Sequence, residues 1–321
     1  MKKVFVISDC IILLTVFLTG CSGLHKLDNP YEFSKRTAFY QSKTVAGKSE
    51  PFAHDLCVVT EDIEDQDQSV TAEAAAVFDR SDERVLFVKK PFKRLYPASI
   101  TKVMTALLAL KYGNLTDKVT VTRDAVITES GASLCGIKPG DELTLEQLLY
   151  GLLLPSGNDA GAAIAVSISG GEEPFAKLMN EEAVKLGATG THFMNPHGLH
   201  NEDHYTTAYD LYLIFNEALK YPEFRKIIGT AKYDAVYLDA SGKEVSAVWK
   251  DTNWYLTGER QMPNGLTVMG GKTGTTQAAG SCLIMGSLDA SNREYISVVL
   301  NAKNHDGLYH NMSNILNKIV E

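Results

Sequence analysis

The chain has 321 residues, of which 45% are hydrophobic and 22% charged, a composition typical of a folded protein with one large core or two small ones. The formal net charge is -8 at pH 7, and no basic stripe runs along the sequence, which argues against nucleic acid as a partner. An anionic substrate would therefore need a local cation in its binding site.

The first residues have the layout of a secretory signal. A positive start at residues 1–3 precedes the mostly apolar residues 4–18, and Leu-Thr-Gly-Cys follows at residues 18–21. This apolar stretch is shorter than the roughly 20 residues that a helix needs to span a bilayer. We therefore expect residues 1–20 to be a signal peptide and the mature protein to be exported.

Residues 18–21 resemble the lipobox of bacterial lipoproteins, in which the cysteine becomes the lipid-modified first residue of the mature chain. This resemblance implies that Cys21 anchors the protein to the membrane. Asp9 and Cys10 interrupt the apolar run, so an uncleaved signal is the alternative interpretation. The other three cysteines of the mature chain are odd in number and irregularly spaced, which predicts neither a disulfide framework nor a metal site; they are Cys57, Cys135 and Cys282.

A polar, irregular stretch follows the cysteine. Residues 22 to 70 include the acidic tract Glu61–Asp67, in which Ile63 is the single apolar residue. Charged stretches of this kind tend to extend and to remain solvated. We expect residues 21–70 to be a tether and residues 71–321 to be the folded domain.

Strand and helix patterns alternate along the predicted domain. Apolar residues 74–78 and 85–88 flank a polar turn and predict a hairpin. Residues 99–112 are rich in Ala and Leu on all sides, which predicts a buried central helix. Four more helices are predicted, at residues 143–154, 160–169, 174–186 and 207–219.

The last third of the chain changes to strand patterns. Short apolar or β-branched runs occur at residues 236–238, 245–249, 266–269, 282–288 and 295–301, and residues 307–320 have a helical period. Strands at both ends with helices between them predict an α+β domain, in which an antiparallel sheet is closed by both termini and a helical lobe is inserted.

The first motif with chemical potential is Ser99-Ile100-Thr101-Lys102, at the start of the predicted central helix. Side chains three residues apart share a helix face, so the amine of Lys102 can reach the hydroxyl of Ser99. A serine becomes a strong nucleophile when a base takes its proton, and burial can lower the pKa of a lysine enough for that role. The alternative is an N-cap serine followed by a solvated lysine.

The second motif is Ser156-Gly157-Asn158, in a tight connection between two apolar helices. Gly157 permits a turn, while Ser156 and Asn158 can project a hydroxyl and an amide into one cavity. Such a pair could relay a proton and hold a substrate amide. The alternative is an ordinary turn, for which these residue types are also expected.

The third motif is Lys272-Thr273-Gly274, after the apolar residues 266–269. A lysine and a threonine on a strand edge can bind a carboxylate, and Gly274 leaves space for an extended peptide. The competing interpretation is a phosphate-binding loop, but Gly265 stands one residue too far from Lys272 for that spacing.

Together, in the order S-x-x-K, S-x-N and K-T-G, the three motifs resemble the active site of penicillin-binding proteins and serine β-lactamases. Wider matches narrow the resemblance to the low-molecular-mass D-alanyl-D-alanine carboxypeptidases. These matches are Tyr-Pro-Ala-Ser at 96–99, Leu-Pro-Ser-Gly-Asn-Asp-Ala at 154–160, Phe-Met-Asn-Pro-His-Gly-Leu at 193–199, His-Tyr-Thr-Thr-Ala-Tyr-Asp-Leu at 204–211 and Gly-Lys-Thr-Gly at 271–274. The similarity covers the chain from about residue 74 to its end, and residues 71–321 would be the catalytic domain.

The resemblance implies a role for each motif residue. Ser99 would attack the carbonyl of the penultimate D-alanine of a peptidoglycan stem peptide, with Lys102 as the proton acceptor, and Ser156 would pass the proton to the leaving D-alanine. The remaining residues would bind the substrate. Asn158 would hold a substrate amide, and Lys272 and Thr273 would bind the terminal carboxylate. The backbone N–H groups of Ser99 and Thr275 would stabilise the oxyanion. Water would then release the acyl group, and β-lactams would inhibit by the same acylation. This chemistry requires no metal or cofactor.

Many members of that family continue into a β-rich domain and an amphipathic membrane-binding helix. This sequence leaves no space for them after Asn301, so the lipid on Cys21 is expected to replace that anchor. The histidines 197, 200 and 204 match no ligand spacing and are interpreted as structural. Trp249 and Trp254 could line a peptide cleft, but aromatic residues near strands usually belong to the core.

Three functional alternatives remain open. A β-lactamase would need a further general base to deacylate the drug, and the sequence contains no Glu-x-x-Leu-Asn segment of the kind such enzymes use. A non-catalytic wall-binding or β-lactam-sensing lipoprotein could keep the fold, although the intact motifs argue against it. Transfer of the acyl group to a second stem peptide differs from hydrolysis in the acceptor, which the sequence does not identify.

Overall fold

The computed structural model describes residues 55–59 and 67–320. The expected signal peptide and Cys21 therefore lie outside the described residues, as does most of the acidic tract. Contacts divide the chain into residues 1–42, which are wholly outside the described part, and residues 43–321. Within the described ranges, no helix has both the length and the hydropathy that crossing a membrane requires.

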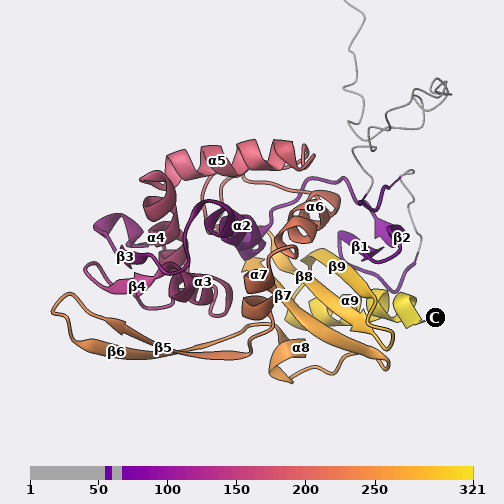
Figure 1. The fold of residues 1–321 in the computed structure, drawn as a ribbon. Coiled ribbons are helices and arrows are strands. Elements are labelled where there is room, and N and C mark those ends of the chain that lie inside the picture. The colour runs from indigo at the N-terminus through magenta and orange to yellow at the C-terminus, as the bar shows by residue number, and fades with distance from the viewer. Residues whose placement is uncertain (1–54, 60–66, 321) are drawn as a thin grey trace, which may run out of the picture. The chain divides into compact units, whose positions relative to one another are not determined.

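Strands from both ends of the folded part form one antiparallel sheet of five strands (Figure 1). The order is β2-β1-β9-β8-β7, so the N-terminal hairpin pairs with the C-terminal strand β9, and Ala75 lies opposite Val299. The predicted closure of the sheet by both ends of the domain is confirmed. The strands are β1 (Ala74–Asp79), β2 (Arg84–Lys89), β7 (Leu266–Thr276), β8 (Gly280–Asp289) and β9 (Glu294–Ala302).

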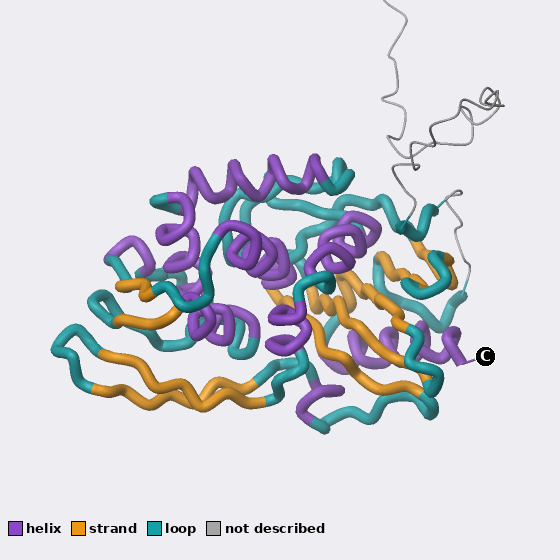
Figure 2. Tube along the Cα trace, viewed as in Figure 1, coloured by secondary structure: helices purple, strands orange, loops and turns teal. Residues whose placement is uncertain are grey.

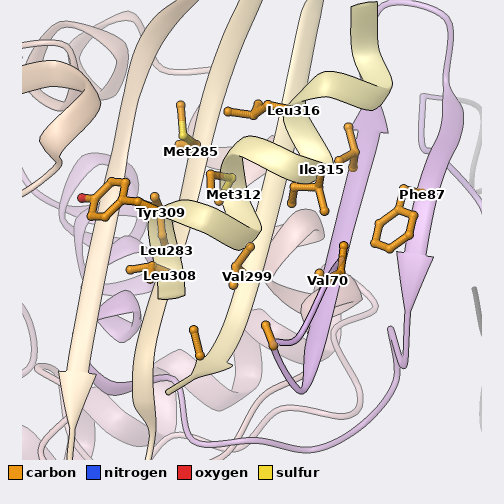
Figure 3. Packing of buried hydrophobic residues seen from close by; sticks show 14 of the residues in the cluster. Val70, Phe87, Leu283, Met285, Val299, Leu308, Tyr309, Met312, Ile315 and Leu316 are labelled. Carbon is orange, nitrogen blue, oxygen red and sulfur yellow. The ribbon is translucent and has the colours of Figure 1, made fainter. Parts of the chain in front are cut away.

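Helix α9 (His305–Val320) covers one face of this sheet. Apolar side chains recur on α9 at helical spacing, at residues 308, 312, 315 and 316, and they meet the buried residues 283, 285 and 299 of the sheet (Figure 3). Because helix α6 packs on the opposite side of β1 and β9, the central strands are apolar on both faces. Continuous apolar runs such as residues 282–285 follow from this burial.

Helices form the lobe beside the sheet (Figure 2). Helix α3 begins with a capping box in which the Thr144 side chain and the Gln147 side chain each bind the other residue's backbone N–H. At the start of α6 the Thr207 side chain accepts from the Asp210 backbone, at the predicted helix start. The helices are α2 (Lys102–Tyr112), α3 (Leu145–Leu153), α4 (Asn158–Ser169), α5 (Glu172–Lys185), α6 (Ala208–Ala218), α7 (Pro222–Ile228) and α8 (Trp254–Thr257).

A second sheet of four strands, in the order β3-β4-β5-β6, departs from the single sheet expected from the sequence. The predicted strands near residues 236–238 and 245–249 belong to it. Its short strands β3 and β4 have three residues each, too few to show an alternating pattern. The strands are β3 (Lys118–Thr120), β4 (Glu142–Thr144), β5 (Lys232–Leu238) and β6 (Glu244–Lys250).

Part of the segment expected to be a tether packs against the domain. Cys57 and Val59 are buried, and the backbone of Cys57 is held on both sides by α6: its N–H donates to the Tyr212 hydroxyl, and its carbonyl accepts from the Tyr209 hydroxyl. Val70 lies in the core beneath α9 (Figure 3). Packed residues therefore begin before the expected boundary at residue 71.

Candidate active site

Ser99 and Lys102 lie where the 3-10 turn η3 (Ala98–Thr101) runs directly into α2. The Lys102 Nζ is 3.0 Å from the Ser99 Oγ, so the helix brings the two groups together as their spacing predicts. The preceding residue, Ala98, has a φ of 47°, a left-handed conformation that is rare for a residue with a side chain. The nucleophile candidate therefore follows a strained turn.

The surroundings of Lys102 favour its neutral form. The side chain is 0% exposed, and burial lowers the pKa of Lys102 well below its ordinary value, with a further lowering by the charge of Lys272 and an opposing effect of Asp159. The amine donates to the Asn158 Oδ1 at 2.6 Å and to the His197 carbonyl at 2.7 Å. Because these two acceptors use both N–H bonds of a neutral amine, its lone pair is left for the Ser99 hydroxyl.

Ser156 lies in the tight connection between α3 and α4, and its backbone is strained. Its φ is 63°, and the next residue, Gly157, donates its N–H to the Gly151 carbonyl at 3.0 Å. A Cβ at Gly157 would come within 2.7 Å of that carbonyl, so the turn requires glycine. The Ser156 Oγ is buried and has no hydrogen-bond partner among the described residues. A strained backbone that carries an unpaired buried hydroxyl is typical of a functional position.

Asn158 and Asp159 begin α4 and have different contacts. The Asn158 side chain meets Lys102, while the Asp159 carboxylate accepts from the backbone N–H groups of Cys135 and Gly136, both at 2.9 Å. Asp159 therefore fixes the backbone of residues 135 and 136 beside the start of α4. Nothing local in the sequence indicates this role, because the two N–H groups that Asp159 binds lie 24 and 23 residues earlier in the chain.

Lys272, Thr273 and Gly274 lie within β7, at the edge of the five-stranded sheet. A Cβ at Gly274 would come within 2.8 Å of the Pro97 carbonyl and 3.0 Å of the Ser99 backbone nitrogen, so η3 packs directly on this strand. The glycine thus brings the backbone of Ser99 beside the strand segment that carries Thr275. Because β7 is an edge strand, an extended peptide can pair with it as an added strand.

Lys272 is as deeply buried as Lys102, at 1% exposure. Burial lowers the pKa of Lys272, and the negative charge of Asp251 raises it again. The neighbouring Thr273 Oγ1 lies 2.5 Å from the Thr252 Oγ1. Asp251 and Thr252 therefore belong to the site, and their residue types alone do not indicate this in the sequence.

The histidines near the site support its backbone. The His204 Nδ1 accepts from the Met194 N–H, so its Nε2 carries the proton and donates at 2.8 Å to the Thr101 hydroxyl, which donates to the Ala98 carbonyl. Burial lowers the pKa of His204 to about 3, which keeps the ring neutral. Within residues 55–59 and 67–320, no group of three or more His, Cys, Asp or Glu side chains could hold a metal ion.

The two tryptophans are structural. Trp249 is buried, and its Nε1 donates to the Cys135 carbonyl at 2.9 Å. Trp254 stacks on Tyr309, with the ring centroids 4.6 Å apart. At the rim of the site, the Thr275 Oγ1 lies 3.2 Å from the Nε2 of the exposed His305.

Comparison with known proteins gives consistent matches. Residues 60–304 match the model of the peptidase S11 family, described as D-alanyl-D-alanine carboxypeptidase. The carboxypeptidase DacF of Bacillus subtilis is 38% identical over 236 residues, which cover 72% of this chain and 57% of DacF. The carboxypeptidase DacC of Escherichia coli is 36% identical over 252 residues, which cover 73% of this chain and 58% of DacC. This chain thus spans somewhat more than half the length of these curated relatives.

A solved structure agrees with these sequence matches. The Streptomyces K15 DD-transpeptidase aligns with a TM-score of 0.72 at 30% identity, over 78% of this chain and 97% of that one. The expected α+β fold of the penicillin-binding protein type is therefore confirmed.

Proposed function

This chain belongs to the peptidase S11 family of D-alanyl-D-alanine carboxypeptidases, and from this premise we propose that it removes the terminal D-alanine from peptidoglycan stem peptides through an acyl-enzyme on Ser99. The observation that carries the proposal is the contact between the buried Lys102 amine, whose pKa burial lowers, and the Ser99 hydroxyl. Lys272 is close enough for its charge to lower the pKa of Lys102 further. A general base and an anion-binding group in one site fit a substrate that ends in a free carboxylate.

In the acylation step, Lys102 takes the Ser99 proton while the Ser99 oxygen bonds to the carbonyl carbon of the penultimate D-alanine. The negative oxygen that forms is stabilised by the backbone N–H groups of Ser99 and Thr275. The bond from carbon to the leaving nitrogen then breaks, and the proton passes from Lys102 through Ser156 to that nitrogen. D-Alanine leaves, and the rest of the peptide stays as an ester on Ser99.

Substrate binding involves the other motif residues. Lys272 and Thr273 bind the terminal carboxylate, and the Asn158 amide holds a peptide amide. In deacylation a water gives its proton to the base and attacks the ester, which releases the shortened peptide and restores Ser99. A β-lactam acylates the same serine by opening its ring, so no fragment departs and the second step stalls.

The test is release of D-alanine from a pentapeptide that ends in D-Ala-D-Ala, together with labelling by a fluorescent penicillin. We expect both reactions in the wild-type protein and neither in the Ser99→Ala variant. Absence of both reactions from a folded wild-type protein contradicts the proposal. Labelling without release of D-alanine would instead favour the alternative that the protein is a non-catalytic, β-lactam-sensing lipoprotein.

Transfer of the acyl group to an amine is the second candidate, because the solved neighbour is a DD-transpeptidase. A curated relative from Streptomyces K15, 33% identical over 214 residues, is named a D-alanyl-D-alanine carboxypeptidase. Adding an acceptor peptide to the D-alanine assay separates the two reactions. A cross-linked product that increases with acceptor, at the expense of the hydrolysed one, would show transfer.

We also propose that the protein is exported and held on the outer face of the membrane by a lipid on Cys21. The support is the lipobox resemblance of residues 18–21. The intact mass of the membrane-extracted protein should exceed that of the mature chain by a diacylglyceryl group, and the Cys21→Ala variant should lack this addition. A protein that still carries residues 1–20 and no lipid would contradict the anchor.

A further inference from the structure

The site contains two buried lysines that need opposite charge states. Lys102 must be neutral to take the Ser99 proton, whereas Lys272 must be charged to attract a carboxylate. Both are almost wholly buried, and burial alone would push both toward the neutral form. A further group must therefore determine which of the two amines carries the proton.

Lys272 has few hydrogen bonds to stabilise its charge. Among the described residues, its Nζ donates one hydrogen bond, at 2.9 Å to the carbonyl of Thr273. An ammonium group has three donors. A backbone carbonyl carries no full charge, so this contact does not offset the cost of burying the cation.

Asp251 lies directly after β6 and is buried, with 8% exposure. Its Oδ1 accepts from the Asn253 N–H at 2.6 Å, which fixes the carboxylate in the loop 251–253. The contact of Thr252 with Thr273 holds this loop against β7. Directly after the loop, the start of α8 is held by α9, where the Tyr309 hydroxyl accepts from the Trp254 N–H. The loop therefore places a carboxylate next to the strand segment that carries Lys272.

We propose that Asp251 is a positioning residue that keeps Lys272 charged, so that of the two lysines Lys272 carries the proton and Lys102 stays free to act as the base. This inference rests on the proposed acylation of Ser99. It adds to the three motifs a carboxylate that none of them contains.

The electrostatics of the surrounding groups support this role. Burial raises the pKa of Asp251 and lowers that of Lys272, and the charge of each opposes the shift of the other. The charge of Lys272 in turn lowers the pKa of Lys102, against an opposing effect of Asp159. Tyr309 contacts the same loop, where its hydroxyl donates to the Thr252 carbonyl at 3.5 Å; its pKa is raised, first by its own burial and to a smaller extent by the charge of Asp251. Lys272 is thus the positive group on which the charge of Asp251 acts and which in turn acts on Lys102.

The test is the pH profile of acylation in the Asp251→Asn variant. The amide keeps the oxygen that accepts from Asn253 and removes the charge. With benzylpenicillin, which carries a carboxylate, we expect the basic limb of the profile to move to lower pH by about one unit, while the acidic limb, set by Lys102, stays in place. With a penicillin ester, which lacks the carboxylate, the basic limb should not move.

Asp141→Asn is the matched control, because Asp141 is also a buried carboxylate, and it binds the backbone of Lys138 instead. This control should leave both limbs unchanged. Equal slowing of Asp251→Asn at every pH and with both ligands would indicate a purely structural role and overturn the inference. If the wild-type protein is not acylated at all, the proposed function itself is contradicted. This outcome differs from failure of the present inference, in which the wild-type protein is acylated but the pH profile of Asp251→Asn does not shift.

A measurement on the wild-type protein keeps the inference testable if the variant does not fold. In protein labelled with carbon-13 at lysine Cε, the NMR signals of Lys102 and Lys272 are identified by their loss in the Lys102→Gln and Lys272→Gln variants. We expect Lys272 to lose its proton at higher pH than Lys102. The reverse order would overturn the inference.

Discussion

At the scale of single residues, the pH dependence of acylation follows from Lys102. Burial lowers its pKa, with Lys272 adding to the effect, and only the neutral amine can take the Ser99 proton. Acylation should therefore be fast above the pKa of Lys102 in the folded protein and decline as the pH falls through it. The rate of labelling by a fluorescent penicillin, measured from about pH 4 to 9, tests this. A rate independent of pH on the acidic side would contradict the role of Lys102 as the base.

Removal of the base has a separate consequence. Lys102→Gln keeps a side chain of similar length and takes away the lone pair, so acylation should slow by about 10²–10⁴-fold, while thermal unfolding shows that the variant is folded. Lys138→Gln, at an exposed position, is the control and should react like the wild type. A variant that is folded and acylated at nearly the wild-type rate would exclude Lys102 as the proton acceptor.

Whether a residue of the site could be predicted from the sequence depends on how far away its partners lie along the chain. Ser99 and Lys102 could be paired from the sequence because a helix fixes the distance between residues three apart. The contacts of Lys102 with Asn158 and with the His197 carbonyl span 56 and 95 residues, and no local pattern encodes them. The sequence predicted Asn158 as a substrate-binding residue of the Ser156-Gly157-Asn158 motif, and not as a partner of Lys102. Asp251 was not predicted because an aspartate after a strand usually belongs to a solvated turn.

At the scale of elements, the site depends on the close packing of η3 on β7. The Gly274→Ala variant would place a Cβ within 2.8–3.0 Å of backbone atoms of Pro97, Ser99 and Ile100, and backbone cannot rotate away as a side chain can. We expect η3 to shift from the strand and acylation to fall by about 100-fold, at a stability cost of about 1–3 kcal/mol. Penicillin labelling and thermal unfolding measure the two effects.

Gly171→Ala is the control for this variant, because a Cβ there would meet ordinary contacts of 3.6–3.7 Å to Pro174. It should leave both acylation and stability near the wild-type values. If Gly274→Ala is acylated at the normal rate, the activity of Ser99 does not depend on the close packing of η3 on β7.

Element prediction succeeded where the pattern was long or repeated. The buried helix at 102–112 and the hairpin of β1 and β2 were found because their apolar patterns are continuous. Strand β7 was predicted to end at residue 269 but continues to Thr276, since Gly-Gly-Lys-Thr-Gly has low strand propensity and is held by pairing with β8. Tertiary pairing thus overrides local preference at the very strand that carries the motif.

At the scale of the whole domain, closure of the sheet by β1 and β9 means that the site forms only when distant segments meet. Helices α2 and α6 lie between these strands in sequence, and His204 links the loop before α6 to η3 through Thr101. Protonation of His204 at Nδ1 would abolish its acceptance from the Met194 N–H. A neutral His204 is therefore part of the folded state.

The stability of the domain should consequently fall in mildly acidic solution. Burial lowers the pKa of His204 from the ordinary 6.5 to about 3, so between these values the unfolded chain binds a proton that the folded chain does not, and stability declines as the pH falls through that window. In His204→Gln this contribution is absent, and the melting temperature should fall less steeply than that of the wild type between about pH 6.5 and 4. The control is His310→Gln, which replaces an exposed histidine and should keep the wild-type dependence of the melting temperature on pH. If the melting temperatures of the wild type and His204→Gln change in parallel with pH, His204 accepts a proton in the folded domain.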